Sequence, residues 1–189
     1  MKERDISPQN YMNLLEREVT DMKKALIIVD MQNDFVTGCL GTNEAQEVIP
    51  KIKEYADAFD GDIYFTMDTH RDDYLDTQEG KRLPVKHGVK DSDGWLIVPE
   101  LRDIKDVQTF EKPVFGSREL AEKIAEKAYD EVYLCGVCTG ICVLSNAILI
   151  KAFDADVRVA VVKELCACVT PDTHKTALDA MATAQIDII

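Results

Sequence analysis

The sequence predicts an α/β fold, a three-layer αβα sandwich built on a six-stranded, mostly parallel, doubly wound sheet. Six short runs rich in β-branched residues alternate with segments of helical periodicity. Most of these runs are apolar at nearly every position, as in parallel strands that are covered on both faces. A chain of 189 residues is also the right length for one such domain. Alternation of this kind favours right-handed crossovers between neighbouring strands.

The expected strands and helices follow each other along most of the chain. The strands are Ala25–Val29, Ile63–Met67, Val107–Phe110, Val132–Cys135, Val157–Val162 and Ile186–Ile189. The helices are Ile49–Phe59, Arg118–Tyr129, Ile141–Ala152 and Asp172–Ala182. In the second helix Leu120, Ile124 and Ala128 recur every four residues, while charged residues occupy the other positions.

Two segments fall outside this alternation. Residues 7–22 predict an amphipathic helix, with Ser7 as N-cap and Pro8 in the first turn. We expect residues 1–22 to form an extension that docks on its own domain or on a neighbouring subunit, and residues 23–189 to form a single domain. Residues 71–106 form a connection too long for an inert loop in a compact domain, which indicates a functional role.

Composition excludes several classes of protein. Acidic residues outnumber basic ones by 35 to 22, and a net charge of −13 repels both nucleic-acid phosphates and anionic membranes. The charged N-terminus is not followed by the apolar run of a signal peptide, and the stretch Ile141–Phe153 is too short to span a bilayer. We therefore expect a cytoplasmic protein with reduced thiols, in which Cys39, Cys166 and Cys168 are packing residues.

Three polar residues are expected at the carboxyl ends of the strands, where the sites of open parallel sheets lie. Asp30 follows the first strand, Lys112 follows the third, and Cys142 begins the helix after the fourth. The helix dipole favours a thiolate at Cys142, and free backbone N–H groups there could receive an oxyanion. Taken singly, they could be a loop acid, a surface lysine and a small buried cysteine. Together they predict an acid/base, a cation and a nucleophile.

A second group of residues predicts a metal site. Asp68 and His70 follow the second strand, and Glu79 and His87 lie in the long connection. Mixed nitrogen and oxygen ligands of this kind suit one divalent ion, Zn, Fe or Mn. The alternative is a set of loop residues satisfied by hydrogen bonds. Asp72, Asp73 and Asp76 are competing carboxylates, and His174 is expected to be a capping or packing histidine.

Over about residues 25–189 the sequence resembles the isochorismatase-like cysteine hydrolases, in particular their nicotinamidase branch. The matching motifs are Val29-Asp30-Met31-Gln32-Asn33-Asp34-Phe35 with Gly38, Asp68-Thr69-His70, Lys112, and Gly136-Val137-Cys138-Thr139-Gly140-Ile141-Cys142-Val143. The chain departs from the family at Gly140, where an aspartate is usual, at Leu83, where a tryptophan is usual, and in the shortened segment 113–117.

The resemblance implies an Asp30–Lys112–Cys142 triad, and a cis peptide bond between Val137 and Cys138 that aims the Cys138 and Cys142 amides at the substrate oxygen. It also implies a divalent metal on Asp68, His70, Glu79 and His87, substrate contacts from Phe35 and Trp95, and a homo-oligomer.

The expected activity is hydrolysis of a small-molecule amide: nicotinamide and water give nicotinate and ammonia through a Cys142 thioester. One alternative is the same triad acting on another amide, a carbamoyl compound or isochorismate. In a second alternative, a metal ion or an iron–sulfur cluster is bound by Cys135, Cys138 and Cys142. The third is a binding protein without catalysis.

Overall fold

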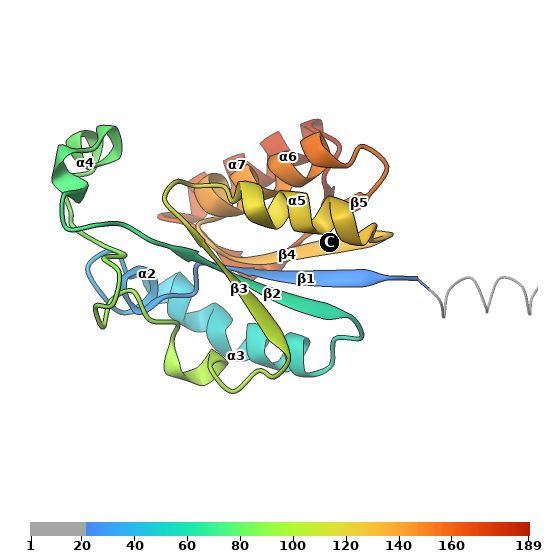
Figure 1. The fold of residues 1–189 in the computed structure, drawn as a ribbon, viewed down its shortest axis with the longest axis horizontal. Coiled ribbons are helices and arrows are strands. Elements are labelled where there is room, and N and C mark those ends of the chain that lie inside the picture. The colour runs from blue at the N-terminus through green and yellow to red at the C-terminus, as the bar shows by residue number, and fades with distance from the viewer. Residues whose placement is uncertain (1–21) are drawn as a thin grey trace, which may run out of the picture.

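A computed structural model describes residues 22–189 (Figure 1), and within that range six strands form one parallel sheet in the order β3-β2-β1-β4-β5-β6. The strands are β1 (Lys24–Val29), β2 (Asp62–Asp68), β3 (Val107–Lys112), β4 (Glu131–Val137), β5 (Arg158–Ala167) and β6 (Asp187–Ile188). The α/β fold with a doubly wound sheet is confirmed. The helix expected over residues 7–22 lies, apart from Met22, outside the described residues and stays a prediction.

Helices cover both faces of the sheet, which gives three layers. One face is covered by α3 and the other by α5, α6 and α7 (Figure 1). The helices are α2 (Asn33–Val36), α3 (Asn43–Asp57), α4 (Gln78–Arg82), α5 (Arg118–Lys127), α6 (Leu144–Phe153) and α7 (Pro171–Thr183). The central strand β1 is fully buried from Ala25 to Val29. This explains why its sequence is apolar without alternation.

Two elements are longer than the sequence indicated. The helix expected to begin at Ile49 begins six residues earlier, where the Thr42 hydroxyl accepts a hydrogen bond from the Ala45 amide. The polar first turn hid this start because it lacks apolar periodicity. Strand β5 continues past Val162 to Ala167, and the β4–β5 register shifts on the way, between Leu134 and Gly136. This extension places Ala167 beside Val137 at the carboxyl end of the sheet.

The chain leaves β4 through unusual backbone geometry. Gly136 has φ of +108°, and a Cβ there would lie 2.2 Å from the Val29 carbonyl oxygen of β1, so only glycine fits. The next peptide bond, Val137–Cys138, is cis, as the resemblance implies. The expected helix from Ile141 to Ala152 is a π-helical turn, Thr139–Val143, followed by α6.

The long connection after β2 is not an irregular loop throughout. It contains α4 and two 3-10 turns, Tyr74–Asp76 and Pro99–Leu101. It then comes back beside the residues that follow β2, where His70 pairs with Val89 in an isolated parallel bridge. Figure 1 shows α4 at the end of the molecule where α2 also lies. None of the helices in residues 22–189 combines the length and apolarity needed to cross a membrane.

Candidate active site and metal centre

Asp30 is the residue directly after β1, and its backbone has a φ of +50°. Aspartate tolerates this left-handed conformation better than most residues do. The carboxylate is buried, with 1% of its surface exposed. Its Oδ1 accepts a hydrogen bond from the Thr66 hydroxyl at 2.6 Å, and its Oδ2 lies 2.6 Å from Lys112 Nζ. Burial raises the pKa of Asp30, and the nearby ammonium only partly offsets this.

Lys112 connects the two predicted groups of residues. Its buried ammonium lies 2.6 Å from Asp30 Oδ2, 3.1 Å from Asp68 Oδ1 and 3.6 Å from Cys142 Sγ. Lys112 and Asp68 are register partners at the ends of β3 and β2, so the sheet itself sets one of these contacts. Burial acts to lower the pKa of Lys112, but Asp30, Cys142 and Asp68 outweigh it and raise the pKa. The lysine is therefore a permanent cation.

Cys142 lies in the π-helical turn and is 6% exposed. Burial, reinforced by Asp30, raises the pKa of its thiol, although Lys112 acts in the opposite direction. Burial therefore outweighs the stabilisation of a thiolate that was expected from the helix dipole. Dipole effects of about 0.3–2 kcal/mol are smaller than the cost of burying an anion. At rest the sulfur holds its proton, and the raised pKa of Asp30 makes that carboxylate a suitable acceptor for it.

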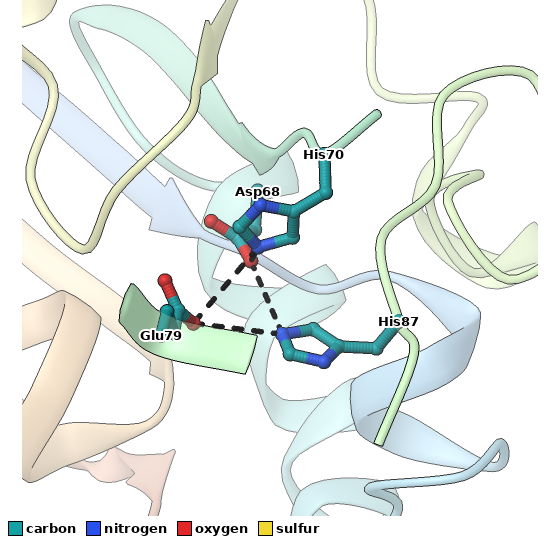
Figure 2. A group of neighbouring side chains, drawn as sticks. All are labelled: Asp68, His70, Glu79 and His87. Atoms are coloured by element: carbon teal, nitrogen blue, oxygen red, sulfur yellow. Dashed lines mark hydrogen bonds and ion pairs between the residues drawn. The ribbon is translucent and has the colours of Figure 1, made fainter. Parts of the chain in front are cut away.

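The four predicted metal ligands converge on one point, and Figure 2 shows their side chains pointing toward one another. One ligand atom from each of Asp68, His70, Glu79 and His87 lies within 4.8 Å of all the others. The Nε2 atom of His70 is 2.8 Å from Asp68 Oδ2 and 3.9 Å from Glu79 Oε1. The Nε2 atom of His87 is 3.6 and 3.8 Å from the same two oxygens.

These separations, 2.8 to 3.9 Å, lie on both sides of the values expected around one small divalent ion, so side-chain shifts would bring the ligand atoms to bonding positions. Ligand atoms about 2.1 Å from one zinc, at angles between 90° and the tetrahedral value, lie roughly 3.0–3.4 Å apart. The Nδ1 atom of His87 is 2.7 Å from the Val85 carbonyl oxygen, a hydrogen bond that leaves the Nε2 lone pair directed into the cluster. Burial would raise the pKa of Asp68, but the adjacent rings of His70 and His87, together with the Lys112 ammonium, lower it. The carboxylate therefore stays ionised, as a ligand must.

Two residues that the sequence did not single out support this cluster. Gln32 is fully buried, and its side chain accepts from the Asp68 amide at 2.7 Å and donates to the Asp68 carbonyl at 2.9 Å. Tyr74 is also fully buried, and its ring centroid lies 4.6 Å from that of His70 and 4.8 Å from that of His87. Gln32 belongs to the motif that carries the resemblance, whereas no sequence signal marks Tyr74.

The nucleophile and the metal cluster open into one cavity of about 430 Å³. Asp68, Glu79, His87 and Cys142 line it, and so does the predicted Phe35, whose ring meets His87 edge-on at 5.3 Å. Most of the wall is apolar. Large side chains at the mouth remain partly exposed, namely Leu83, Phe115, Ile141 and Val169. Among the lining residues, all of them within the described range, there is no lysine or arginine.

Trp95 is not part of this cavity. Its indole N–H donates to the Thr69 hydroxyl at 2.9 Å, and its carbonyl accepts from Gln32. A bridge between Gln32 and Ile97 holds this part of the connection against the chain after β1. The tryptophan is near the metal loop in sequence, as expected, but the loop holds it by hydrogen bonds outside the cavity wall.

Asn146 is a further buried polar residue that the sequence did not indicate. It lies one turn after Cys142, where its Nδ2 donates to the Cys142 carbonyl at 2.8 Å and to the Phe115 carbonyl at 3.3 Å. Its Oδ1 accepts from the Ser117 amide at 2.9 Å. One side chain thus connects the nucleophile's turn to the segment that follows Lys112.

The remaining cysteines do not form a cluster site. Within residues 22–189 the one group of ligand atoms close enough for a metal is the Asp/His/Glu cluster. Cys135 is buried in β4, away from the cavity wall that Cys138 and Cys142 line. Cys166 is buried as expected, but Cys39 is exposed, and Cys168 lines the cavity. The packing assignment is therefore wrong for Cys39 and incomplete for Cys168. His174 is half-buried and hydrogen-bonded to the Thr139 hydroxyl.

The sequence of the domain matches a known family. The model of the isochorismatase domain covers residues 24–189. The chain belongs to the isochorismatase family. The uncharacterized isochorismatase family protein PncA of Bacillus subtilis is 29% identical over 181 residues, which cover 86% of this chain and 96% of that protein.

Solved structures of the isochorismatase family agree with the fold. The pyrazinamidase of Pyrococcus horikoshii in complex with zinc has a TM-score of 0.74 and 28% identity, and the match covers 88% of this chain and 98% of that one. The pyrazinamidase/nicotinamidase of Streptococcus mutans has a TM-score of 0.74 and 27% identity, and the match covers 88% and all of that chain. This protein is therefore an isochorismatase-like hydrolase with amidases among its relatives.

Proposed function

We propose that this protein is a metal-containing cysteine amidohydrolase that converts nicotinamide and water into nicotinate and ammonia. The observation that carries the proposal is the position of Lys112. Its ammonium contacts Asp30, Cys142 and the metal-site residue Asp68 at once, so the acid/base, the nucleophile and the cluster belong to one site. The amidase names of the relatives in P. horikoshii and S. mutans support the same reaction class.

Asp30, Lys112 and Cys142 have separate roles in the proposed reaction. Asp30 accepts the proton of the Cys142 thiol as the sulfur attacks the amide carbon, and Lys112 keeps Asp30 oriented. The amides of Cys138 and Cys142 hold the oxygen on which negative charge develops, each contributing about 3–4 kcal/mol to the lowering of the barrier. Asp30 then returns the proton to the departing ammonia, which leaves a thioester. A water molecule, deprotonated by Asp30, then attacks the thioester carbon, the C–S bond breaks, and Asp30 returns the proton to the Cys142 sulfur as the acid leaves.

The substrate is oriented from the other side of the cavity. Asp68, His70, Glu79 and His87 would hold the divalent ion, with Phe35 beside His87 for contact with an aromatic ring. A bound ion supplies a Lewis acid for the ring nitrogen of nicotinamide. Because lysine and arginine are absent from the lining residues within 22–189, the cavity suits a neutral amide better than the carboxylates of isochorismate.

Ammonia release from a panel of amides, with and without a chelator, tests the proposal. The panel contains nicotinamide, pyrazinamide, an aliphatic amide and N-carbamoylsarcosine, with isochorismate assayed separately. We expect nicotinamide to be preferred and the chelated protein to lose most of its activity, which added Zn, Fe or Mn restores. Preference for a carbamoyl compound or isochorismate, or activity that survives complete metal removal, would overturn the nicotinamidase assignment.

A further inference from the structure

Two strands deliver a cysteine each to the same place in the cavity wall. Cys138 follows Val137, the last residue of β4, and Cys168 follows Ala167, the last residue of β5. Val137 and Ala167 are register partners in neighbouring parallel strands. Adjacent strands lie about 4.7–4.9 Å apart. That spacing is within the Cα separation of about 4.4–6.8 Å that a disulfide spans.

The two thiols already interact, and they interact unequally. Contact with Cys138, with the Thr173 hydroxyl and with the backbone amides of Gly140 and Val169 lowers the pKa of the Cys168 thiol, although burial opposes it. Contact with Cys168 and burial raise the pKa of Cys138. Ionisation is therefore favoured at Cys168 over Cys138, and a thiolate beside a thiol is the combination needed for oxidation.

The other cysteines contrast with this pair. Burial raises the pKa of Cys135, Cys142 and Cys166, so their sulfurs are protonated and less reactive. Cys39 is exposed, but desolvation and the Asp34 carboxylate raise the pKa of its thiol as well. Cys168 also lines the cavity beside Cys138, so a solute small enough to enter the cavity can reach it.

We propose that Cys138 and Cys168 form a thiol-modification site, in which a small hydroperoxide converts the pair into a disulfide in the cavity wall. The Cys168 thiolate attacks the peroxide oxygen, the O–O bond breaks, and the sulfur becomes a sulfenic acid, while the leaving hydroxide or alkoxide takes a proton from solvent and departs as water or an alcohol. The Cys138 sulfur then attacks the sulfenic sulfur, the S–O bond breaks, and its proton leaves with the hydroxide as water. Two thiols lose two electrons, and one hydroperoxide is reduced.

The site has a direct consequence for the cavity. Cys138 lies between the cis peptide bond and the turn that carries Cys142, and both cysteines line the same cavity. A disulfide to β5 would fix that segment to the neighbouring strand. Oxidation is therefore expected to change the cavity beside the nucleophile without using the nucleophile's own sulfur.

The test is chemical and does not depend on which substrate the enzyme takes. The reduced, full-length protein is treated with one to five equivalents of hydrogen peroxide, its free thiols are alkylated, and its peptides are sequenced by mass spectrometry. We expect a linked peptide joining Cys138 to Cys168, a mass loss of two hydrogens, and full reversal by dithiothreitol. Absence of this linked peptide, or a disulfide that uses Cys142 or Cys39 instead, would overturn the proposal.

Two variants and one rate comparison sharpen the result. Cys168→Ser should give no linked peptide, whereas Cys39→Ser, which removes an exposed thiol outside the pair, should give as much as the wild type. If Cys168→Ser fails to fold, the rates at which iodoacetamide alkylates the cysteines of the wild type test the proposal instead. At pH 6 we expect iodoacetamide to modify Cys168 at least tenfold faster than Cys135 or Cys166. Equal rates would contradict the thiolate on which the site depends.

Discussion

Replacing Lys112 by methionine tests the connection between the two halves of the site. The substitution keeps much of the side-chain volume but removes an ammonium that is 1% exposed. It leaves Asp30 and Asp68 as buried carboxylates that have lost their shared cation. Asp68 keeps its hydrogen-bond contact with His70, whereas Asp30 keeps only uncharged partners, the Thr66 hydroxyl and the Cys142 thiol. The cost therefore falls mainly on Asp30.

The magnitude follows from the distances. At an effective dielectric constant of about 20, unit charges 2.6 Å and 3.1 Å apart attract by roughly 6 and 5 kcal/mol. Burying the ammonium cancels much of this attraction, and removal of one partner of a buried ion pair costs about 3–5 kcal/mol in measured cases. We expect the free energy of unfolding to fall by about 3–5 kcal/mol. Activity should fall by about 10²–10⁴-fold, because Asp30 becomes protonated and cannot act as a base.

Urea denaturation followed by circular dichroism, and ammonia release, measure the two effects separately. The double variant Lys112→Met with Asp30→Asn leaves no unpaired charge at residue 30. It should recover at least half of the lost stability and none of the activity. Lys90→Met is the matched control, since Lys90 forms a surface ion pair with Glu111 at 2.7 Å and should leave both properties near wild type. A stable, active Lys112→Met protein would refute the reasoning.

Four further predictions follow from the same geometry. Cys142→Ala should abolish turnover yet still bind one metal ion per chain by elemental analysis; residual turnover above background would remove the nucleophile assignment. His87→Ala should lose the metal, and unchanged metal content would contradict the cluster. In the wild type, Asp68 raises the pKa of His87 against the effect of burial. Acidification of the wild type should therefore release the metal at a higher pH than an ordinary histidine site would require. Because the pKa of Asp30 is raised, kcat/KM should decline with falling pH along a limb above the usual aspartate range, and a limb near pH 4 would contradict the buried base. Asn146→Ala should lower the free energy of unfolding by about 1–3 kcal/mol, because two hydrogen bonds from this buried side chain are lost. It should also raise KM more than it lowers kcat, because the Phe115 segment loses a hydrogen bond while the triad remains. A loss confined to kcat would contradict this positioning role.

Much of the site could be predicted because the fold converts sequence order into position. Asp30 and Lys112 each lie at the end of a strand, and Cys142 lies just after one, so a parallel sheet brings them to one edge. Two of the metal ligands could be predicted for a related reason, since Asp68 ends β2 and His70 follows it. The substrate contact of Trp95 stays a prediction, because Trp95 is outside the cavity wall and nearness in sequence to a metal loop does not fix which way a side chain points.

Some features could not be read from the sequence because they depend on burial. The helix dipole at Cys142 is a local property that the sequence gives correctly, but the dry surroundings that raise the thiol's pKa come from distant segments. The same holds for Cys168, because the lowering of its pKa depends on contact with Cys138, which follows the neighbouring strand. A register shift between Leu134 and Gly136 and the extension of β5 precede that contact, and neither has a periodic signal.

The sequence by itself determined the succession of six strands and four helices along the chain, the acidic character of the chain, and which chemical groups lie at the strand ends. These properties depend on local periodicity and composition. Only the tertiary structure decided that Lys112 bridges Asp30 and Asp68, so that triad and metal cluster are one site. It also decided which cysteine is acidic and which is not. Interactions between charges depend on separations of a few ångströms and on exclusion of water, and both arise only when distant parts of the chain pack together.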